Sequence, residues 1–161
     1  SGNLLNTRGS FEKSGRAEIL KIALDTNVLI YFLEGIEPYA TKVEDLLYSL
    51  TRGKNEGVVS TMSIAEVLTG FYIAKDEKGA AKTKSLFRDL TRNGFKIAPV
   101  TFEIADIAAS LRARRGGRLP DALIVATAID QAADLVYSQD EDLLRFSEDI
   151  KILKLEQNQA F

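Results

Sequence analysis

The sequence contains no His, no Cys and no Trp among its 161 residues. The absence of Cys excludes disulfides, zinc–thiolate sites and Cys nucleophiles. The absence of His excludes Ser-His-Asp triads, imidazole metal sites and the most common base near neutral pH. Acid–base or metal chemistry in this chain must therefore use carboxylates, Lys, Tyr or Ser/Thr. A metal held by such side chains would have oxygen ligands, which favours Mg²⁺ or Mn²⁺ over Zn²⁺ or Cu²⁺.

The sequence also lacks a long apolar run and a strong excess of one charge. No stretch approaches the ~20 apolar residues that cross a bilayer, so no membrane partner is expected. Residues 1–21 are polar and interrupted by Gly, unlike a signal peptide, which favours a cytoplasmic location. With 21 Lys and Arg against 23 Asp and Glu, the formal net charge is −2. Any contact with nucleic acid must therefore use a local patch of charge.

Length and patterning predict one domain preceded by a polar extension. We assign residues 1–20 to an N-terminal extension, in which Ser1-Gly2 are expected to remain from cloning, and residues 21–161 to a single domain. At ~150 residues, one domain buries roughly 70% of its unfolded surface, which is enough for a core without disulfides. Short apolar runs alternate with longer amphipathic stretches along this domain. The alternation predicts a parallel sheet with helices on both faces, an α/β sandwich.

The expected elements follow from this alternation. Strands are expected at 21–24, 58–59, 95–98, 135–137 and 150–155, and helices at 27–33, 39–51, 63–74, 78–91, 101–115, 120–132 and 141–146. The helix from Ser63 has Glu66 three residues on, which fits a capping box. Pro120 suits the first position of its helix.

Acidic residues lie just after predicted strands or in the first turns of predicted helices, at positions that share one edge of the predicted sheet. Asp25 follows the first strand, and Asp140 and Asp142 follow the fourth. Glu66 lies in the first turn of the helix after the second strand, and Asp121 begins a helix that leads into the fourth strand. Ligands of open parallel sheets bind outside the carboxyl ends of the strands. We therefore expect these acids to converge there.

Each acid also has an ordinary structural explanation. Asp25 could be a turn residue, Glu66 could close its capping box, and Asp121 could be a favourable acid in a first helical turn. Asp140 and Asp142 could be N-terminal acids of a short helix. The combination favours a metal site, because at an effective dielectric of ~20 two carboxylates ~4 Å apart repel by about 4 kcal/mol. A divalent ion would relieve that repulsion.

Four motifs carry a resemblance to a known family. They are Leu24-Asp25-Thr26-Asn27-Val28-Leu29-Ile30, Ser63-Ile64-Ala65-Glu66-Val67, Leu119-Pro120-Asp121-Ala122-Leu123-Ile124-Val125-Ala126-Thr127-Ala128 and Ser138-Gln139-Asp140-Glu141-Asp142-Leu143. The chain resembles the PIN-domain nucleases over residues 21–155, and most closely the VapC-type toxins of prokaryotic toxin–antitoxin pairs. The resemblance implies a three-layer α/β/α sandwich with a short-stranded, mostly parallel sheet. It also implies Mg²⁺- or Mn²⁺-dependent hydrolysis of RNA, a homodimer and an antitoxin protein as partner.

The resemblance also implies site residues. By motif match, Asp25, Glu66 and Asp121 take the places of the family's three core acids, and Asp140 takes the fourth, more variable place. The family usually has Asn or Arg where Gln139 stands, so Asp142 stays an alternative to Asp140. Asp25 and Asp121 would bind the first metal directly, and Glu66 and Asp140 would bind it directly or through water. The polar residues expected to support these acids are Thr26, Asn27, Ser60 and Ser138.

An arginine cluster precedes Asp121 and is the candidate contact for RNA phosphates. It consists of Arg112, Arg114, Arg115 and Arg118. The alternative is a solvated helix end, because cations are favourable at helix C-termini. In the toxin branch such arginines can instead contact an antitoxin. Two other functions stay open, a housekeeping RNA-processing nuclease and a non-catalytic PIN-like module that binds RNA or protein.

Overall fold

A computed structural model describes residues 18–157 of the protein. Its strands form one sheet with the order β3-β2-β1-β4-β5, and every pairing in it is parallel. The strands are β1 (Lys21–Leu24), β2 (Glu56–Ser60), β3 (Phe95–Ala98), β4 (Leu135–Tyr137) and β5 (Lys151–Leu153). The first strand in the sequence is thus the central one in the sheet. Most of the expected N-terminal extension, residues 1–17, lies outside the described residues.

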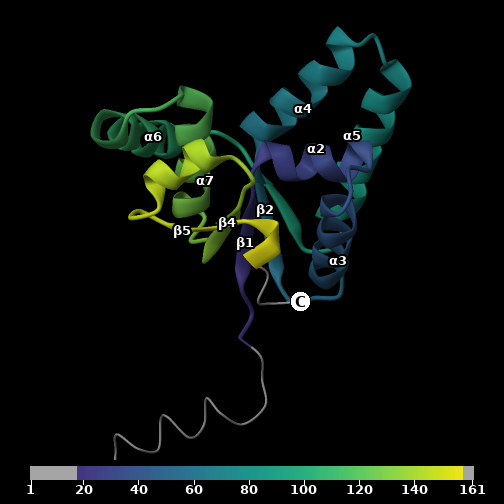
Figure 1. The fold of residues 1–161 in the computed structure, drawn as a ribbon, viewed down its shortest axis with the longest axis horizontal. Helices are drawn as coiled ribbons and strands as arrows, with labels where there is room; N and C mark the ends of the chain where they lie inside the picture. The colour runs from purple at the N-terminus through teal and green to yellow at the C-terminus, as the bar shows by residue number, and fades with distance from the viewer. Residues whose placement is uncertain (1–17, 158–161) are drawn as a thin grey trace, which may run out of the picture.

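Helices cover both faces of this sheet (Figure 1). The α-helices are α2 (Thr26–Glu34), α3 (Tyr39–Thr51), α4 (Thr61–Ile73), α5 (Glu77–Thr91), α6 (Phe102–Arg115) and α7 (Leu119–Asp130). Two 3-10 helices follow, η1 (Glu141–Phe146) and η2 (Leu155–Gln157). Helices α6 and α7 lie on one side of the sheet and α2 to α5 on the other. The predicted three-layer α/β/α sandwich is therefore confirmed, with a sheet that is entirely parallel in residues 18–157.

The two faces of the sheet support two separate cores. Ile22 and Leu24 of β1 pack with α2, α3 and α5, whereas Ala23 between them packs with α6 and α7. Successive side chains of a strand point to opposite faces, so a strand buried on both faces is apolar throughout. Asp25 interrupts this apolar run where β1 ends. The first residue after the central strand is therefore a carboxylic acid, and it lies at the edge of both apolar cores.

The start of α4 differs from the prediction. The helix begins at Thr61, and the Ser60 hydroxyl caps it by accepting a 3.0 Å hydrogen bond from the Met62 amide. Ser63 lies inside the helix and is fully buried. The capping box predicted for Ser63 and Glu66 is therefore wrong. Because β2 runs directly into α4, the serine at the strand end already supplies the acceptor that the first helical amides need.

The other elements lie within a few residues of their predicted bounds. The predicted helix at 141–146 is the 3-10 helix η1, and the fifth strand is shorter than predicted. Helix α6 is capped by the Thr101 side chain, which accepts from the Ile104 amide. Within residues 18–157 no helix has both the length and the apolar character that a bilayer crossing requires.

Candidate active site

Asp25 is fixed at the carboxyl end of the central strand. Only 4% of the residue is exposed. Its Oδ1 accepts a 2.8 Å hydrogen bond from the Thr26 amide and so caps α2, and its Oδ2 accepts a 2.6 Å bond from the Ser138 hydroxyl. Its own amide donates to the Tyr137 carbonyl at 3.0 Å, which joins the end of β1 to the end of β4. The sequence places an acid here, and the fold gives its carboxylate one orientation.

The protonation equilibrium of Asp25 reflects this environment. The pKa of its carboxyl is raised from 3.8 to about 6, mainly by burial and also by the negative charges of Asp121 and Asp140. The hydrogen bonds from Ser138 and Thr26 act in the opposite direction, because they stabilise the carboxylate. The two neighbouring acids are therefore close enough to Asp25 for their charges to act on it.

Asp121 is the second buried acid. It lies in the first turn of α7, a helix buried along most of its length, and 8% of the residue is exposed. Burial raises its pKa, the Arg118 guanidinium lowers it, and the charges of Asp140, Glu66 and Asp142 raise it. We refer to Asp25, Glu66, Asp121 and Asp140 as the acidic cluster. Its members come from four separate parts of the chain.

Glu66 is held by a hydroxyl that neighbours Asp25. The Thr26 hydroxyl donates a 2.8 Å hydrogen bond to Glu66 Oε1 and lies 3.0 Å from Ser63 Oγ. Glu66 itself is half-buried. Thr26 thus links the start of α2 to α4. Its amide donates to Asp25 and its hydroxyl donates to Glu66, so one residue contacts both acids. Local spacing predicts that Ser63 caps a helix and does not predict its contact with Thr26, which lies 37 residues earlier in the sequence.

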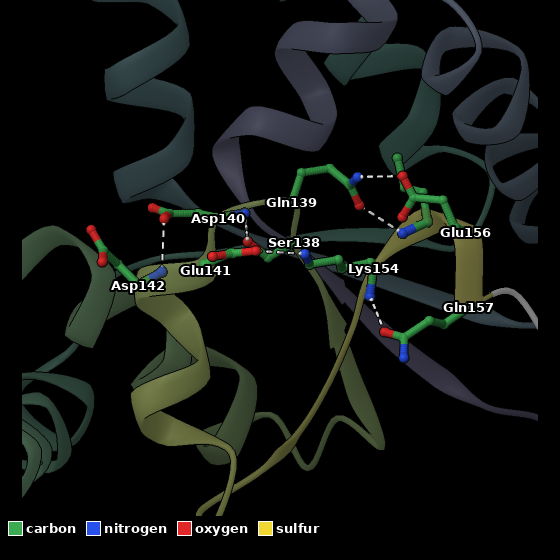
Figure 2. Close-up of polar contacts among 9 residues, drawn as sticks. Ser138, Gln139, Asp140, Glu141, Asp142, Lys154, Glu156 and Gln157 are labelled. Carbon is green, nitrogen blue, oxygen red and sulfur yellow. Dashed lines mark hydrogen bonds and ion pairs between the residues drawn. The ribbon is translucent and has the colours of Figure 1, made fainter.

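The loop after β4 carries Asp140 and Asp142 (Figure 2). The Asp140 amide donates to Ser138 Oγ at 3.0 Å, and Asp140 Oδ1 accepts a 2.9 Å bond from the Asp142 amide at the start of η1. Asp140 is half-buried and its charge acts on both Asp25 and Asp121. Asp142 is exposed and acts on Asp121. Asp140 therefore lies deeper in the site than Asp142.

The four expected support residues divide into two pairs. Thr26 and Ser138 donate directly to members of the acidic cluster. Ser60 caps α4, and Asn27 Oδ1 accepts a 3.3 Å hydrogen bond from the Gln139 amide, so these two hold the backbone around the site. Gln139, which sequence reasoning treated as a departure from the family pattern, is therefore bonded within the site region.

The arginine cluster is divided between structural and exposed positions. Arg114 and Arg115 form ion pairs with Asp149 at 3.0 and 3.1 Å, and Arg115 also pairs with Glu148 at 3.1 Å. These pairs tie the end of α6 to the segment after η1. Arg112 donates to the Gly117 carbonyl and lines an open groove with Gly116, Gly117 and Leu119. Arg118 remains exposed and lies near enough to Asp121 to lower its pKa.

The chemistry of these donors fits a divalent cation. The acidic cluster offers carboxylate oxygens, the ligands that Mg²⁺ and Mn²⁺ prefer. Burial raises the pKa values of Asp25 and Asp121, and the negative charges of neighbouring acids raise them as well. A cation between the carboxylates would offset this repulsion between like charges. Within residues 18–157, however, no three acidic side chains lie close enough together to enclose an ion as they stand.

Comparison with known proteins identifies related sequences and folds. The model of the PIN domain family matches residues 22–149. No curated protein matches the chain. Among solved structures, a toxin–antitoxin complex from Klebsiella pneumoniae aligns with a TM-score of 0.62 and 21% identity, over 83% of this chain and 97% of that one.

Two further solved structures have similar folds. VapBC-1 from nontypeable Haemophilus influenzae aligns with a TM-score of 0.65 and 17% identity, over 86% of this chain and 100% of that one. The Sarcin-Ricin loop cleaving toxin VapC20 of Mycobacterium tuberculosis aligns with a TM-score of 0.60 and 16% identity, over 76% of this chain and 92% of that one. At these identities the alignments establish a shared fold.

Proposed function

The chain belongs to the PIN domain family, and we propose that it is a metal-dependent ribonuclease and the toxin of a toxin–antitoxin pair. The observation that carries the proposal is the burial of Asp25 and Asp121 at the carboxyl end of the central strand, within range of each other's charge. Solved structures with this fold include toxin–antitoxin complexes and a toxin that cleaves the Sarcin-Ricin loop. These similarities support RNA as the substrate.

Each acid has a proposed role. Asp25 and Asp121 would hold Mg²⁺ or Mn²⁺, with Glu66 and Asp140 contributing directly or through water. Asp140 is preferred to Asp142 because it is less exposed and acts on both buried acids. When bound, such an ion lowers the pKa of a coordinated water and polarises a phosphate oxygen. Hydrolysis by this route needs no His, which the chain lacks.

The hydrogen-bonded neighbours orient these acids. Ser138 fixes the Asp25 carboxylate and Thr26 fixes that of Glu66. Because the Ser138 hydroxyl donates to Asp25, it favours the ionised form of that carboxyl, which is the form that binds a cation. We assign the contact with RNA phosphates to Arg118 and Arg112, since the ion pairs with Asp149 already engage Arg114 and Arg115.

The partners proposed for the chain are an antitoxin protein and a second copy of itself. Both follow from the resemblance to VapC-type toxins, and solved toxin–antitoxin structures with the same fold support the first. Binding to the antitoxin would hold the nuclease inactive. The RNA sequence that is cleaved depends on contacts outside the acidic cluster.

The test is an RNA cleavage assay with a matched acidic control. Wild type should cleave RNA with Mg²⁺ or Mn²⁺ and lose activity in EDTA, and Asp121→Asn should lose activity under all conditions. Asp106→Asn removes an exposed acid on α6 and should leave activity unchanged. Activity that survives both EDTA and Asp121→Asn would contradict the proposal.

A growth assay distinguishes the toxin from other nucleases. Expression of the chain alone should arrest growth, and coexpression of the protein encoded by the adjacent gene should restore it. Cleavage of RNA without growth arrest would identify a housekeeping RNA-processing nuclease. An absence of both would leave a non-catalytic binding module as the function.

A further inference from the structure

The Gln139 side chain points away from that of Asp140 and joins the 3-10 helix η2 (Figure 2). Its Oε1 accepts a 2.7 Å hydrogen bond from the Leu155 amide, and its Nε2 donates a 3.0 Å bond to Glu156 Oε1. A carboxamide can make both bonds because it carries one acceptor and one donor group. Leu155 is 1% exposed and packs in the core, so this anchor point is fixed.

Gln139 lies between Ser138, which contacts the acidic cluster, and Asp140, which belongs to it. Ser138 donates to Asp25, and Asp140 has an extended backbone with φ −84° and ψ 114°. Successive side chains of an extended segment point in opposite directions. An anchor on the Gln139 side chain therefore constrains the direction in which the next side chain, that of Asp140, points.

The hydrogen bonds that Asp140 makes itself reach only nearby residues of the same loop. Its amide and its Oδ1 bond to Ser138 Oγ and the Asp142 amide, and both partners are only two residues away. The loop that carries Asp140 is held on the side of β1 by the bond from Ser138 to Asp25 and by the 3.3 Å bond from the Gln139 amide to Asn27 Oδ1. The Gln139 side chain instead spans 16 and 17 residues to Leu155 and Glu156. The nearby ion pair between Lys154 and Glu141 also ties the loop to this segment, but it is exposed and contributes less.

We propose that Gln139 is a positioning residue of the nuclease site, whose carboxamide ties residues 138–142 to η2 and so directs the Asp140 carboxylate toward Asp25 and Asp121. This inference rests on the function proposed above, because the direction of Asp140 affects catalysis only if Asp140 serves the metal-dependent reaction. Glu156 is a suitable partner for the Gln139 amide. Hydrogen bonds to the Glu156 carboxylate, first from its own backbone amide and then from Tyr39 and Gln139, lower its pKa, so it stays an ionised acceptor.

The first experiment measures metal binding without substrate. Mn²⁺ affinity is determined by calorimetry for wild type and Gln139→Ala, with circular dichroism to establish that each variant is folded. Partners that orient metal ligands typically change metal affinity or activity by roughly 10- to 100-fold, and we expect a loss in this range for Gln139→Ala. Lys154→Ala is the matched control, because it removes the exposed ion pair of the same loop and leaves the Gln139 bonds intact.

The second experiment exchanges the donor and the acceptor. Gln139→Glu places a carboxylate opposite that of Glu156 and should lower kcat for RNA cleavage with little change in KM, because substrate contacts are not altered. Adding Glu156→Gln restores one amide donor facing one carboxylate, with the total charge of wild type. We expect the exchanged pair to recover most of the lost kcat, which a loss of general stability would not explain.

The outcomes separate this inference from the proposed function. Failure of wild type to bind Mn²⁺ and to cleave RNA would overturn the proposed function, and the role of Gln139 with it. An active wild type accompanied by folded Gln139 variants of unchanged Mn²⁺ affinity and kcat would overturn the positioning role alone. Equal losses in Gln139→Ala and Lys154→Ala, or no recovery in the exchanged pair, would also overturn it.

Discussion

The Ser138 hydroxyl donates a 2.6 Å hydrogen bond to Oδ2 of Asp25, a residue 113 positions earlier in the sequence. The bond exists because β1 and β4 are adjacent, parallel and in register, so their carboxyl ends lie together. It opposes the effect of burial on the Asp25 pKa and sets the direction of the carboxylate. One hydroxyl thus supports both the charge and the geometry of the central acid.

Ser138→Ala should lower the stability of the protein. The substitution removes the donor to Asp25 and the acceptor of the Asp140 amide, and an unsatisfied buried polar group costs roughly 1–3 kcal/mol. Urea unfolding measures the change. Ser147→Ala is the control, since that serine is exposed, and it should have little effect. Equal stability of wild type and Ser138→Ala would show that the bond contributes nothing net.

Asp25→Asn should stabilise the metal-free protein above pH 6. Because the folded-state pKa is raised from 3.8 to about 6, the folded protein binds the Asp25 proton more tightly than the unfolded chain does. The raised pKa of Asp25 contributes its full stabilisation of the folded state below pH 3.8, and this contribution is lost as the pH rises through about 6. The gain from Asp25→Asn should be about 2 kcal/mol larger near pH 7.5 than near pH 4.5. Chemical denaturation at each pH, in EDTA, measures it.

Asp149→Asn is a control whose effect on stability should depend on pH in the direction opposite to that of Asp25→Asn. Burial opposes ionisation of Asp149, but hydrogen bonds and charge from Arg115 and Arg114 outweigh it and lower its pKa below 3.8. Its contribution to stability is present above 3.8 and is lost as pH falls through the lowered value. Asp149→Asn should therefore destabilise the protein near neutral pH. Parallel pH profiles for the two variants would contradict both assignments.

Divalent cations should raise the melting temperature of the protein. A ligand that binds only the folded state stabilises it by about 2.7 kcal/mol at 100 times its dissociation constant. Differential scanning calorimetry with Mg²⁺ or Mn²⁺ measures the shift against an EDTA reference. The shift should disappear in Asp121→Asn and persist in Asp106→Asn. An equal shift in both variants would place the binding ion elsewhere.

Gly117→Ala should destabilise the corner between α6 and α7. Gly117 has φ +89°, and a Cβ there would lie 2.8 Å from Arg145 Cδ, so strain and a close contact combine. Residues forced into such backbone conformations cost of order 1–3 kcal/mol. Gly70→Ala on α4 meets nothing within 4 Å and should instead stabilise the helix by roughly 0.5–1 kcal/mol. Thermal unfolding compares the two, and equal effects would contradict the role of Gly117.

Much of the fold followed from local patterns in the sequence. The apolar run before Asp25 marks a strand buried on both faces, and Pro120 marks the start of a helix, because residue type and periodicity act over neighbouring residues. The capping box at Ser63 was wrong since Ser60, the last residue of β2, already caps the helix. The local sequence allows either Ser60 or Ser63 to be the N-cap of α4. Because β2 extends to Ser60 and α4 begins at Thr61, Ser60 is the residue that caps the helix.

The sequence by itself determined that no His or Cys can serve as a metal ligand here, and it determined which acids follow the strands. Only the tertiary structure decided that Arg115 pairs with Asp149, and that Gln139 anchors to Leu155. These contacts join segments 34 and 16 residues apart. Hydrogen bonds and ion pairs depend on distance and direction in space, which residue type and periodicity do not specify.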